Sequence, residues 1–255
     1  MNLLELEKQE KKANEQLLYL PKTIELANNL IQAFISKNNI VALKLAIVLS
    51  GAREKIVYKD NKVIFEVEKL CKIMNIEKRD LSRNLPKALE TKFKYVNKEG
   101  GAGMTVPIHS FEYIKRKKFI EIEISSLAKE IFTELQKGAY SFAKDIDPVN
   151  LLALKHKHSI RLQLLLEQIR NYSDNVAKRK RMTLEELNAY FGVNYRSYYE
   201  FENKILIPVK EELDSNSKLT FEYEFIDEIQ GQGRPKIKEV LIDIISRSEY
   251  QGRLL

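Results

Sequence analysis

The chain has 255 residues, and its 43 Lys and Arg against 36 Asp and Glu give a formal net charge of +7 at pH 7. This length is enough for one large domain or two modest ones, and the basic excess favours a polyanionic partner. No apolar run approaches the ~20 residues of a membrane span, and the charged start is unlike a secretory signal, so we expect a cytoplasmic protein without a membrane partner. The single cysteine, Cys71, excludes an internal disulfide and a multi-thiolate zinc site.

Residues 1–34 are predicted to form an N-terminal helical arm, although residues 3–18 have little apolar surface to bury and also fit a poorly ordered terminus. Leucines lie on both sides of a charged stretch within residues 3–18, and apolar residues recur at helical spacing from Thr23 to Phe34. The apolar stretch from Val41 to Ser50 then predicts a buried helix that ends near Gly51.

The first domain is placed at residues 35–145. Its apolar spacing predicts a strand, two helices and then several strands. In chain order these are a strand at Val63–Val67, helices at Glu68–Met74 and Glu77–Thr91, strands at 94–97, 105–113 and 119–124, a closing helix at 125–138 and a connection at 139–145. Pro86 is expected to kink the second helix, because proline removes a backbone donor.

The second domain is placed at residues 146–255, and local signals mark its first helices. Asp147-Pro148 is a cap followed by a first-turn proline, which is typical of a helix start. The next helix is predicted at Ser159–Tyr172, because its leucines and Ile169 are spaced for one face.

Two further helix starts follow in close succession. Thr183 and Glu186 form a predicted capping box, and Gly192 supplies the left-handed residue that ends a short helix. Ser197 and Glu200 form a second predicted capping box, which opens a longer helix. A short helix, a tight turn and a longer helix make a helix-turn-helix.

A hairpin is predicted after the helix-turn-helix. Residues 219–226 and 237–245 alternate apolar with polar, and the glycines of 231–235 are typical of a flexible tip. A helix-turn-helix followed by such a hairpin is a winged helix. Because the first domain repeats the order helix, helix, hairpin, the predicted fold class is α+β, mainly helical, with two tandem winged-helix domains.

Candidate DNA-contacting side chains gather on the second helix of the second domain. A helix-turn-helix places this helix in a major groove, where arginine suits guanine and asparagine suits adenine. The base-edge candidates are Arg196, Tyr198, Tyr199, Asn203 and Lys204. Some of these aromatic residues are also candidates for the core.

The corresponding helix of the first domain carries a second set of base-edge candidates, Lys78, Arg79, Ser82, Arg83 and Lys87, which also fit a solvated helix face. Other basic residues are candidates for phosphate or wing contacts. They are Lys178, Arg179, Lys180, Arg181, Arg234, Lys236, Lys238, Lys115, Arg116, Lys117 and Lys118. Runs of this kind are also common in solvated loops and turns.

Enzyme functions are poorly supported by the sequence. His156-Lys157-His158 resembles a paired-histidine metal motif, but no carboxylate is spaced as a third ligand. The glycines at 100–103 lack the Lys-Ser/Thr of a phosphate loop and instead predict a hairpin turn. We therefore expect no catalytic residue, no metal site and no cofactor.

In its ordered set of motifs the chain resembles the iteron-binding replication initiator (Rep) proteins of theta-replicating plasmids, which are built from two winged helices. The similar stretches are Ser159–Leu165, Thr183–Gly192, Pro208–Asp214, Lys218–Tyr223 and Gly233–Lys236. Three positions depart from the family's pattern: Gln163 stands where an aromatic is usual, and Val209 and Asp214 replace the commoner Ala and Asn. The resemblance covers the second domain well and the first only by architecture.

The resemblance implies an initiator that binds direct repeats (iterons) of double-stranded DNA at a plasmid origin, promotes origin opening and recruits host replication proteins such as a helicase or initiator. It also implies a homodimer in equilibrium with monomer, with the first domain as dimer interface, able to repress its own gene. The residues alone support a two-domain, sequence-specific DNA binder. A winged-helix transcriptional regulator and a winged-helix protein-interaction module stay open as alternatives.

Overall fold

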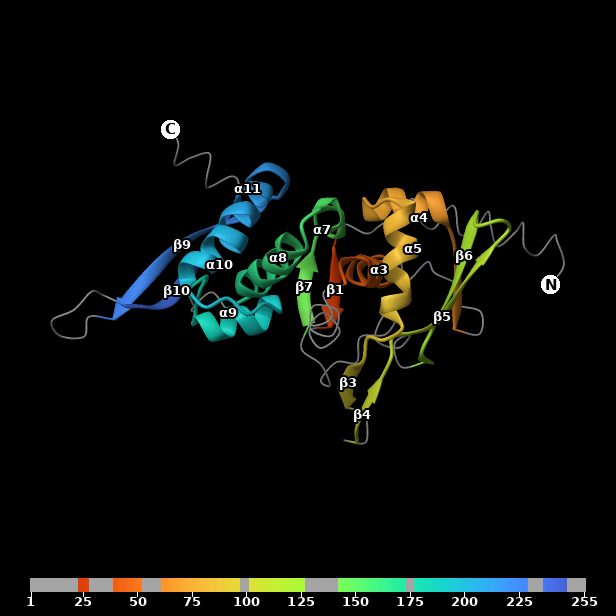
Figure 1. Cartoon of the computed structure of the whole chain (residues 1–255), viewed down its shortest axis with the longest axis horizontal. Helices are drawn as coiled ribbons and strands as arrows, with labels where there is room; N and C mark the ends of the chain where they lie inside the picture. Colours follow the sequence, from red (N-terminus) through yellow and green to blue (C-terminus); the bar gives the residue numbers. More distant parts are fainter. Residues whose placement is uncertain are drawn as a thin grey trace. The chain divides into compact units, whose positions relative to one another are not determined.

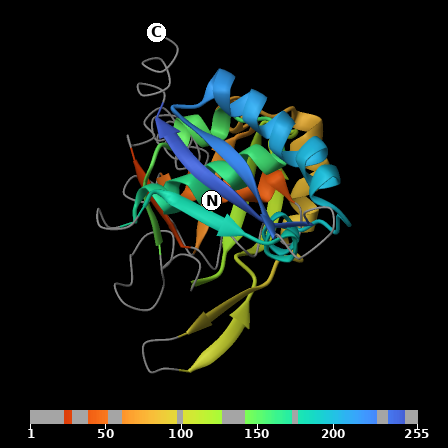
Figure 2. The same cartoon turned by 90° about the vertical axis from the view of Figure 1, so that its left-hand side faces the viewer.

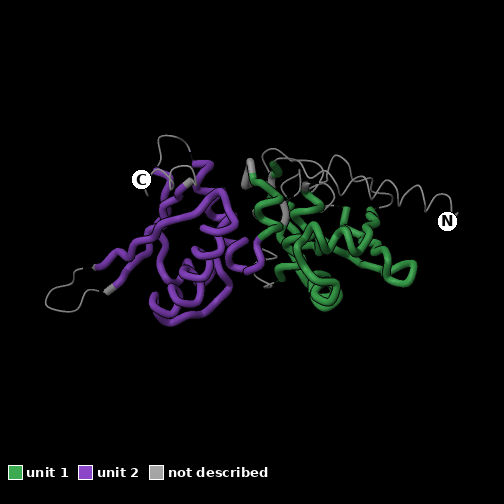
Figure 3. Tube along the Cα trace, turned by 90° about the horizontal axis from the view of Figure 1, so that it is seen from above, with its two compact units in different colours: residues 1–153 green, residues 154–255 purple. Residues whose placement is uncertain are grey.

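The computed structural model describes residues 23–27, 39–51, 61–96, 101–126, 142–172, 177–228 and 236–246. The chain forms two compact units, Met1–Ala153 and Leu154–Leu255 (Figure 3). None of the helices in these described ranges has both the length and the apolar character that crossing a membrane requires.

Unit 1 is built around α3 (Ile40–Gly51), a helix whose residues from Val41 to Ser50 are buried. Helices α4 (Val67–Met74), α5 (Lys78–Ala88) and α7 (Pro148–Ala153) pack against it. Lys44, buried within α3, donates from Nζ to the carbonyls of Met74 at 2.7 Å and Leu152 at 2.9 Å. Carbonyls at the C-terminal end of a helix favour a cation. The buried lysine of α3 therefore holds the ends of α4 and α7 against α3.

Two antiparallel sheets of unit 1 lie between α3 and α7 in the sequence. One has the order β2 (Lys62–Glu66), β6 (Phe119–Ile124), β5 (Ile108–Ile114), and the other pairs β3 (Phe93–Val96) with β4 (Ala102–Thr105). The β3–β4 hairpin projects from the body of its unit (Figures 1 and 2). The single strand predicted at 105–113 is divided into β4 and β5, because Pro107 between them has no N–H to donate.

Residues 24–27 and 142–146 form strands instead of the predicted helical arm and connection. β1 (Ile24–Ala27) pairs antiparallel with β7 (Phe142–Ile146). Ile24 and Leu26 are both buried and lie two residues apart, which places them on one face of a strand. Their spacing within residues 23–34 also fits a helix, and a strand partner far along the chain leaves no local signal. The rest of the arm, and residues 127–138 of the predicted closing helix, lie outside the described residues.

The division between the units falls after Ala153, whereas the sequence places the second domain from residue 146. Helix α7 begins at the predicted Asp147-Pro148 signal, and the carboxylate of Asp147 accepts from the N–H groups of Val149 and Asn150 at 3.0 and 3.2 Å. Because α7 packs on α3 and α4, it lies in unit 1.

Unit 2 is built around α8 (Lys157–Arg170), which is buried from His158 to Glu167. It also holds α9 (Leu184–Phe191) and one long helix in three parts, α10 (Tyr198–Phe201), η1 (Glu202–Leu206) and α11 (Ile207–Asn216). Its antiparallel sheet has the order β8 (Arg179–Met182), β10 (Lys236–Ser246), β9 (Leu219–Glu228). Strands β9 and β10 form the long blue ribbon of Figure 1.

The first predicted capping box is confirmed. Thr183 Oγ1 accepts from the N–H of Glu186 at 3.2 Å, and the Glu186 carboxylate accepts from the N–H of Thr183 at 2.8 Å. Gly192 ends α9 in the left-handed region, with φ of 60°. The second capping box is only half formed, because the Glu200 carboxylate accepts from the N–H of Arg196 at 3.3 Å and not from Ser197.

The long helix contains a π-turn that is not expected from the sequence. The turn covers Glu202–Leu206, and the N–H of Ile207 donates to the carbonyl of Glu202, five residues earlier. Pro208 follows directly. It has no N–H to donate, and in a regular α-helix its ring would clash with the carbonyl of Lys204. We attribute the wider turn to this proline.

The basic run 178–181, predicted as a loop, largely forms β8. Residues 179–182 pair with Val240–Asp243 of β10. Met182 is buried, Lys180 is half-buried, and Arg179 and Arg181 are exposed. A strand with one buried methionine among basic residues has too little apolar alternation to be recognised from sequence.

A buried arginine joins α8 to the end of α9. Arg161 is 2% exposed, and its Nη1 donates to the carbonyl of Phe191, the last residue of α9. The hydroxyl of Tyr190 donates to the carbonyl of Arg161 at 2.9 Å. Burial lowers the pKa of Arg161 to about 10, so the side chain stays charged at neutral pH and satisfies a carbonyl at the helix end.

Unit 2 is expected to lose stability in mild acid because of His158. This side chain is 4% exposed beside Phe191, and burial first, then the charges of Arg161 and Lys157, lowers its pKa to about 3. The imidazole of His158 has its ordinary pKa of ~6.5 in the unfolded chain and a lower one in the folded chain. As the pH falls below ~6.5, the unfolded chain therefore binds a proton that the folded chain does not, and the folded state loses stability. At pH 5 the loss is about 2 kcal/mol, from about 1.5 pKa units at ~1.36 kcal/mol each.

Between pH 7 and pH 5, His158→Leu should therefore lose about 2 kcal/mol less unfolding free energy than the unchanged chain. Urea unfolding followed by circular dichroism at the two pH values measures this difference. His109→Leu, at an exposed position of β5, is the control and should behave like the unchanged chain. An equal loss in His158→Leu would contradict a neutral, buried His158.

Candidate nucleic-acid interface

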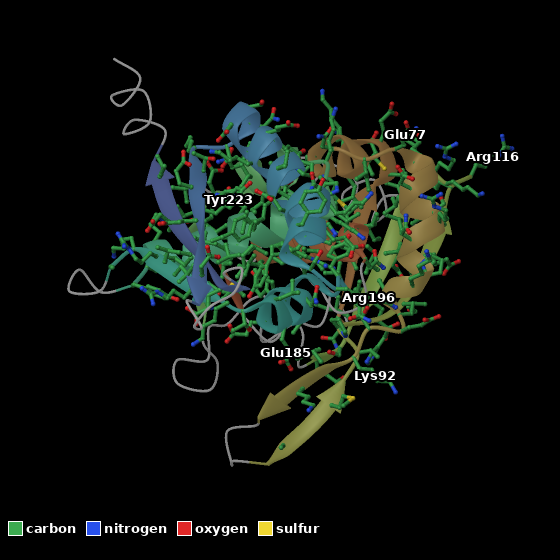
Figure 4. The ribbon with its side chains drawn as sticks, turned by 60° about the vertical axis from the view of Figure 1, so that its left-hand side comes forward. Glu77, Lys92, Arg116, Glu185, Arg196 and Tyr223 are labelled. Carbon is green, nitrogen blue, oxygen red and sulfur yellow. The ribbon has the colours of Figure 1, made fainter. Side chains whose placement is uncertain are left out.

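The long helix of unit 2 has one buried side and one exposed side. Its buried side carries Phe201, Ile205 and Val209, each fully buried. The exposed side, with the residue just before the helix, is the recognition face: Arg196, Tyr199, Asn203, Lys204 and Ile207. Figure 4 shows Arg196 at the start of this helix.

The recognition face combines side chains that suit base edges. Asn203 Nδ2 donates to the carbonyl of Tyr199 at 2.7 Å, which fixes the amide on its own helix. Arg196 lies at the N-terminal end of the helix, where its backbone N–H binds Glu200. Arginine pairs with guanine O6 and N7, and asparagine with adenine N6 and N7, so this face offers two kinds of base recognition.

Tyr198, predicted as a base contact, instead connects three segments within unit 2. Its hydroxyl accepts from the N–H of Leu184 at 2.8 Å and donates to the carbonyl of Lys238. Its ring packs edge-on against Phe225, with centroids 6.0 Å apart. The side chain therefore holds α9, the long helix and the hairpin together, and we withdraw it as a base contact.

The β9–β10 hairpin is joined to the long helix at two further points. Tyr223 of β9, labelled in Figure 4, donates from its hydroxyl to the carboxylate of Glu202 in the π-turn at 2.8 Å. Burial and this carboxylate raise the pKa of Tyr223. Lys210 of α11 donates to the carbonyl of Phe221 at 2.9 Å and lies 3.3 Å from Asp214. Helix and wing therefore form one body.

The four basic residues before α9 differ in their surroundings. Lys178 Nζ donates to the carbonyls of Arg170 and Tyr172 at the end of α8. Arg179 is paired with Asp243 at 3.0 Å and Arg181 with Glu239 at 4.0 Å. Lys180 lies on the opposite side of β8 from these two arginines, where Met182 is buried. Cations already paired with carboxylates offer less attraction to phosphate.

Three basic residues, Arg234, Lys236 and Lys238, are predicted to contact DNA from the β9–β10 hairpin, and the structure describes only part of them. Lys238 of β10 is exposed. Arg234 and the side chain of Lys236 lie outside the described residues.

In unit 1 the predicted base-edge residues share the exposed side of one helix. Lys78, Arg79, Ser82, Arg83 and Lys87 are all exposed on α5. Lys78, Arg79 and Arg83 have carboxylates within 3.3–3.8 Å, at exposed positions where such pairs contribute little. The hydroxyls of Ser82 and Tyr113 are 3.2 Å apart, which joins α5 to β5.

The turn between β5 and β6 carries the four basic residues Lys115–Lys118 in an unusual backbone. Lys115, Arg116 and Lys117 all have left-handed φ values, of 48°, 54° and 68°. This conformation costs roughly 1–2 kcal/mol per non-glycine residue. Lys115 and Lys118 lie 5.5 and 5.1 Å from the ring centroid of Phe119. Arg116 extends outwards from the turn (Figure 4).

Of the paired histidines, His158 is buried in the core of unit 2 and His156 is half-buried beside it. Their ring centroids are 5.2 Å apart, and His158 is buried against Phe191. Within the described ranges no three His, Cys, Asp or Glu side chains are grouped to hold a metal ion.

Ile207 belongs to the recognition face but is not among the sequence candidates. It is 39% exposed although it is apolar, and it lies four residues after Asn203. The spacing of four along Tyr199, Asn203 and Ile207 is the signal that could have identified it.

The order of elements in each unit, with helices followed by an antiparallel hairpin, is that of a winged helix. Two family models match the chain, "Initiator Replication protein, WH1" over residues 23–167 and "Initiator Rep protein, WH2" over residues 183–244. The chain belongs to this family of replication initiator proteins and has its two winged-helix domains, as the sequence predicts. A comparison with curated proteins finds no match.

One solved structure shows the same fold, and two others are similar over part of their length. The chain resembles the Pi initiator protein, solved in complex with iteron DNA, with a TM-score of 0.66 and 13% identity over 89% of this chain and 98% of that one. The RctB domains 2-3 match with a TM-score of 0.44 and 15% identity over 86% of this chain and 84% of that one. The MSBI1.176 WH1 domain matches 39% of this chain and 86% of that one, with a TM-score of 0.26 and 14% identity.

Two adjacent tyrosines should respond differently to loss of their hydroxyls. Tyr198→Phe removes both bonds of a hydroxyl that joins three segments and should lower the unfolding free energy by about 1–3 kcal/mol. Tyr199 is 75% exposed, so Tyr199→Phe should change it by less than about 0.5 kcal/mol. Urea unfolding of the two variants measures both. Equal effects would mean that the Tyr198 hydroxyl does not hold the wing to the helices.

Proposed function

We propose that this protein is a plasmid replication initiator that binds repeated sequences (iterons) of double-stranded DNA at the replication origin. The observation that carries the proposal is the recognition face, a set of exposed base-suited side chains on a helix fixed to its wing. Membership of the replication initiator family supports it. So does the Pi initiator, which shares the fold and is solved with iteron DNA.

In this proposal the long helix of unit 2 lies in a major groove. Arg196 binds a guanine edge, Asn203 an adenine edge and Lys204 a further base edge, while Lys180 and Lys238 approach phosphates. Polar and basic residues of unit 1 act in the same way. They are the α5 set Lys78, Arg79, Ser82, Arg83 and Lys87 and the turn Lys115–Lys118.

Four further properties rest on the resemblance to plasmid Rep proteins. After binding, the protein promotes opening of adjacent A·T-rich DNA and recruits host replication proteins in the cytoplasm. Its first domain forms a homodimer in equilibrium with monomer. The dimer represses the protein's own gene.

Footprinting on the DNA that flanks the gene tests the binding proposal. A protected series of direct repeats is expected, with affinity falling steeply as salt rises, because phosphate contacts release counterions. Maintenance of a plasmid that depends on those repeats separates an initiator from a transcriptional regulator. Salt-independent association with a protein, and no DNA protection, would favour the protein-interaction module.

Specificity should divide between two kinds of residue. Arg196→Ala or Asn203→Ala should cost roughly 1–3 kcal/mol on the cognate repeat and little on random duplex, because each removes a base contact. Lys180→Ala should weaken binding to the cognate repeat and to random duplex alike. It should also lower the slope of log affinity against log salt concentration by about one unit. The measured quantity is the ratio of the two affinities. If only Lys180→Ala changes that ratio, then the long helix is not the element that selects the site.

The purified protein is expected neither to nick DNA nor to hydrolyse ATP, with or without divalent metal. The physical reason is that His158 of the histidine pair is buried in the unit 2 core, and that the sequence has no phosphate loop. Conversion of supercoiled plasmid to open circles and release of phosphate are the measurements. Metal-dependent nicking that is lost in His156→Ala would contradict a non-enzymatic initiator.

A further inference from the structure

The recognition face contains an exposed apolar pair that base recognition by Arg196 and Asn203 does not explain. Tyr199 is 75% exposed and Ile207 is 39% exposed. The other exposed large hydrophobic residues of the described ranges, Met104, Val149 and Ile237, lie singly on different elements. Exposed apolar side chains at helical spacing indicate a contact surface.

The π-turn brings the two apolar side chains towards one line along the helix. In a regular α-helix of 3.6 residues per turn, positions 199 and 207 would diverge by about 80° around the axis. The turn at Glu202–Leu206 takes more residues per turn, with the N–H of Ile207 bonded to the carbonyl of Glu202. This reduces the divergence, so Tyr199, Asn203 and Ile207 follow one another on the exposed side.

Neither side chain is needed by the core of unit 2. The buried side of the same helix is supplied by Phe201, Ile205, Leu206, Val209 and Leu213, which are all fully buried. The bond that fixes Asn203 uses the backbone carbonyl of Tyr199 and not its ring. The exposed apolar area of the pair is therefore available to a partner.

The charges around the pair favour a polyanion as that partner. Exposed Arg196 and Lys204 lie on the same face. Two nearby carboxylates are engaged within the protein, Glu200 by the N–H of Arg196 and Glu202 by the hydroxyl of Tyr223. Exposed Glu211 lies one turn beyond Ile207, and its negative charge marks the end of the part of the helix that favours a polyanion. A basic surface with a central apolar pair matches a major groove lined by thymine methyl groups.

We infer that Tyr199 and Ile207 are specificity-determining residues that contact the C5-methyl groups of two thymines in the major groove, on either side of the base pair bound by Asn203. The inference rests on the proposed function, since it requires the long helix to enter the groove. The thymine methyl is the apolar group on the major-groove edges of the bases, so the preferred repeat contains A·T pairs at these positions.

Removal of single methyl groups from the DNA tests the inference. Binding sites are first selected with the full chain from a pool of random DNA duplexes. Each thymine of the selected site is then replaced by deoxyuridine, which lacks only the C5-methyl. Loss of one buried methyl at ~0.8 kcal/mol corresponds to about 4-fold weaker binding, and this loss is expected at two thymine positions.

Substitutions in the protein assign each methyl group to its side chain. Tyr199→Ala should abolish the uracil effect at one of the two positions, and Ile207→Ala at the other. Val149→Ala, at an exposed apolar position in α7 of unit 1, is the control and should keep both effects. Circular dichroism melting of the variants should match the unchanged chain, since both residues are exposed.

Three outcomes separate this inference from the proposed function. A selected site that tolerates uracil everywhere, or uracil effects that persist in Tyr199→Ala and Ile207→Ala, would overturn the inference alone. In that case Arg196→Ala and Asn203→Ala still lower the ratio of specific to random affinity. If no sequence is enriched from the random pool, the proposed function and the inference both fail, and a protein becomes the partner for the apolar pair.

Discussion

The geometry of unit 2 depends on a charged arginine inside its core. Burying an isolated charge costs several kcal/mol unless hydrogen bonds compensate it, and Arg161 donates to the carbonyl of Phe191 at the end of α9. The ring of Phe191 packs against His158 of α8 and, with centroids 5.4 Å apart, against Phe201 of the long helix. Phe191 thus fixes the end of α9 both to α8 and to the long helix. The left-handed Gly192 follows directly, so the start of the recognition face is positioned from the core.

A second constraint fixes the other end of the long helix and explains a departure from the family's pattern. Gln163, where an aromatic is usual, accepts from Ser217 Oγ at 2.8 Å and donates to Glu167 at 3.2 Å, all in buried positions. Ser217 ends α11 and its Oγ also accepts from the N–H of Leu219, the first residue of β9. A satisfied buried polar network of this kind specifies one arrangement. With Tyr198 and Tyr223, it makes the helix-turn-helix and the wing a single rigid body.

Features with local signals could be predicted from the sequence, and features set by distant partners could not. The Thr183 capping box, the Gly192 helix end and most helices and strands follow from neighbouring residues. The β1–β7 pair joins distant segments, and β8 is a basic run whose strand character comes only from pairing with β10. In the site, helical spacing correctly separates Tyr199, Asn203 and Lys204, which are exposed, from Phe201, Ile205 and Val209, which are buried. It could not show that Tyr198 turns inwards to bind Leu184 and Lys238, or that the long helix contains a π-turn before Pro208.

The central claim is that the long helix of unit 2 lies in the major groove of the recognised DNA. Its most direct test is cleavage by an iron chelate attached to one cysteine, in a chain whose sole natural cysteine, the buried Cys71, is replaced by alanine. A chelate at Lys204→Cys, on the recognition face, should cut within the protected repeat with the strand offset of a major-groove probe. A chelate at Glu224→Cys, exposed on β9, should cut weakly or outside it. Strong cleavage from position 224 and none from position 204 would contradict the account.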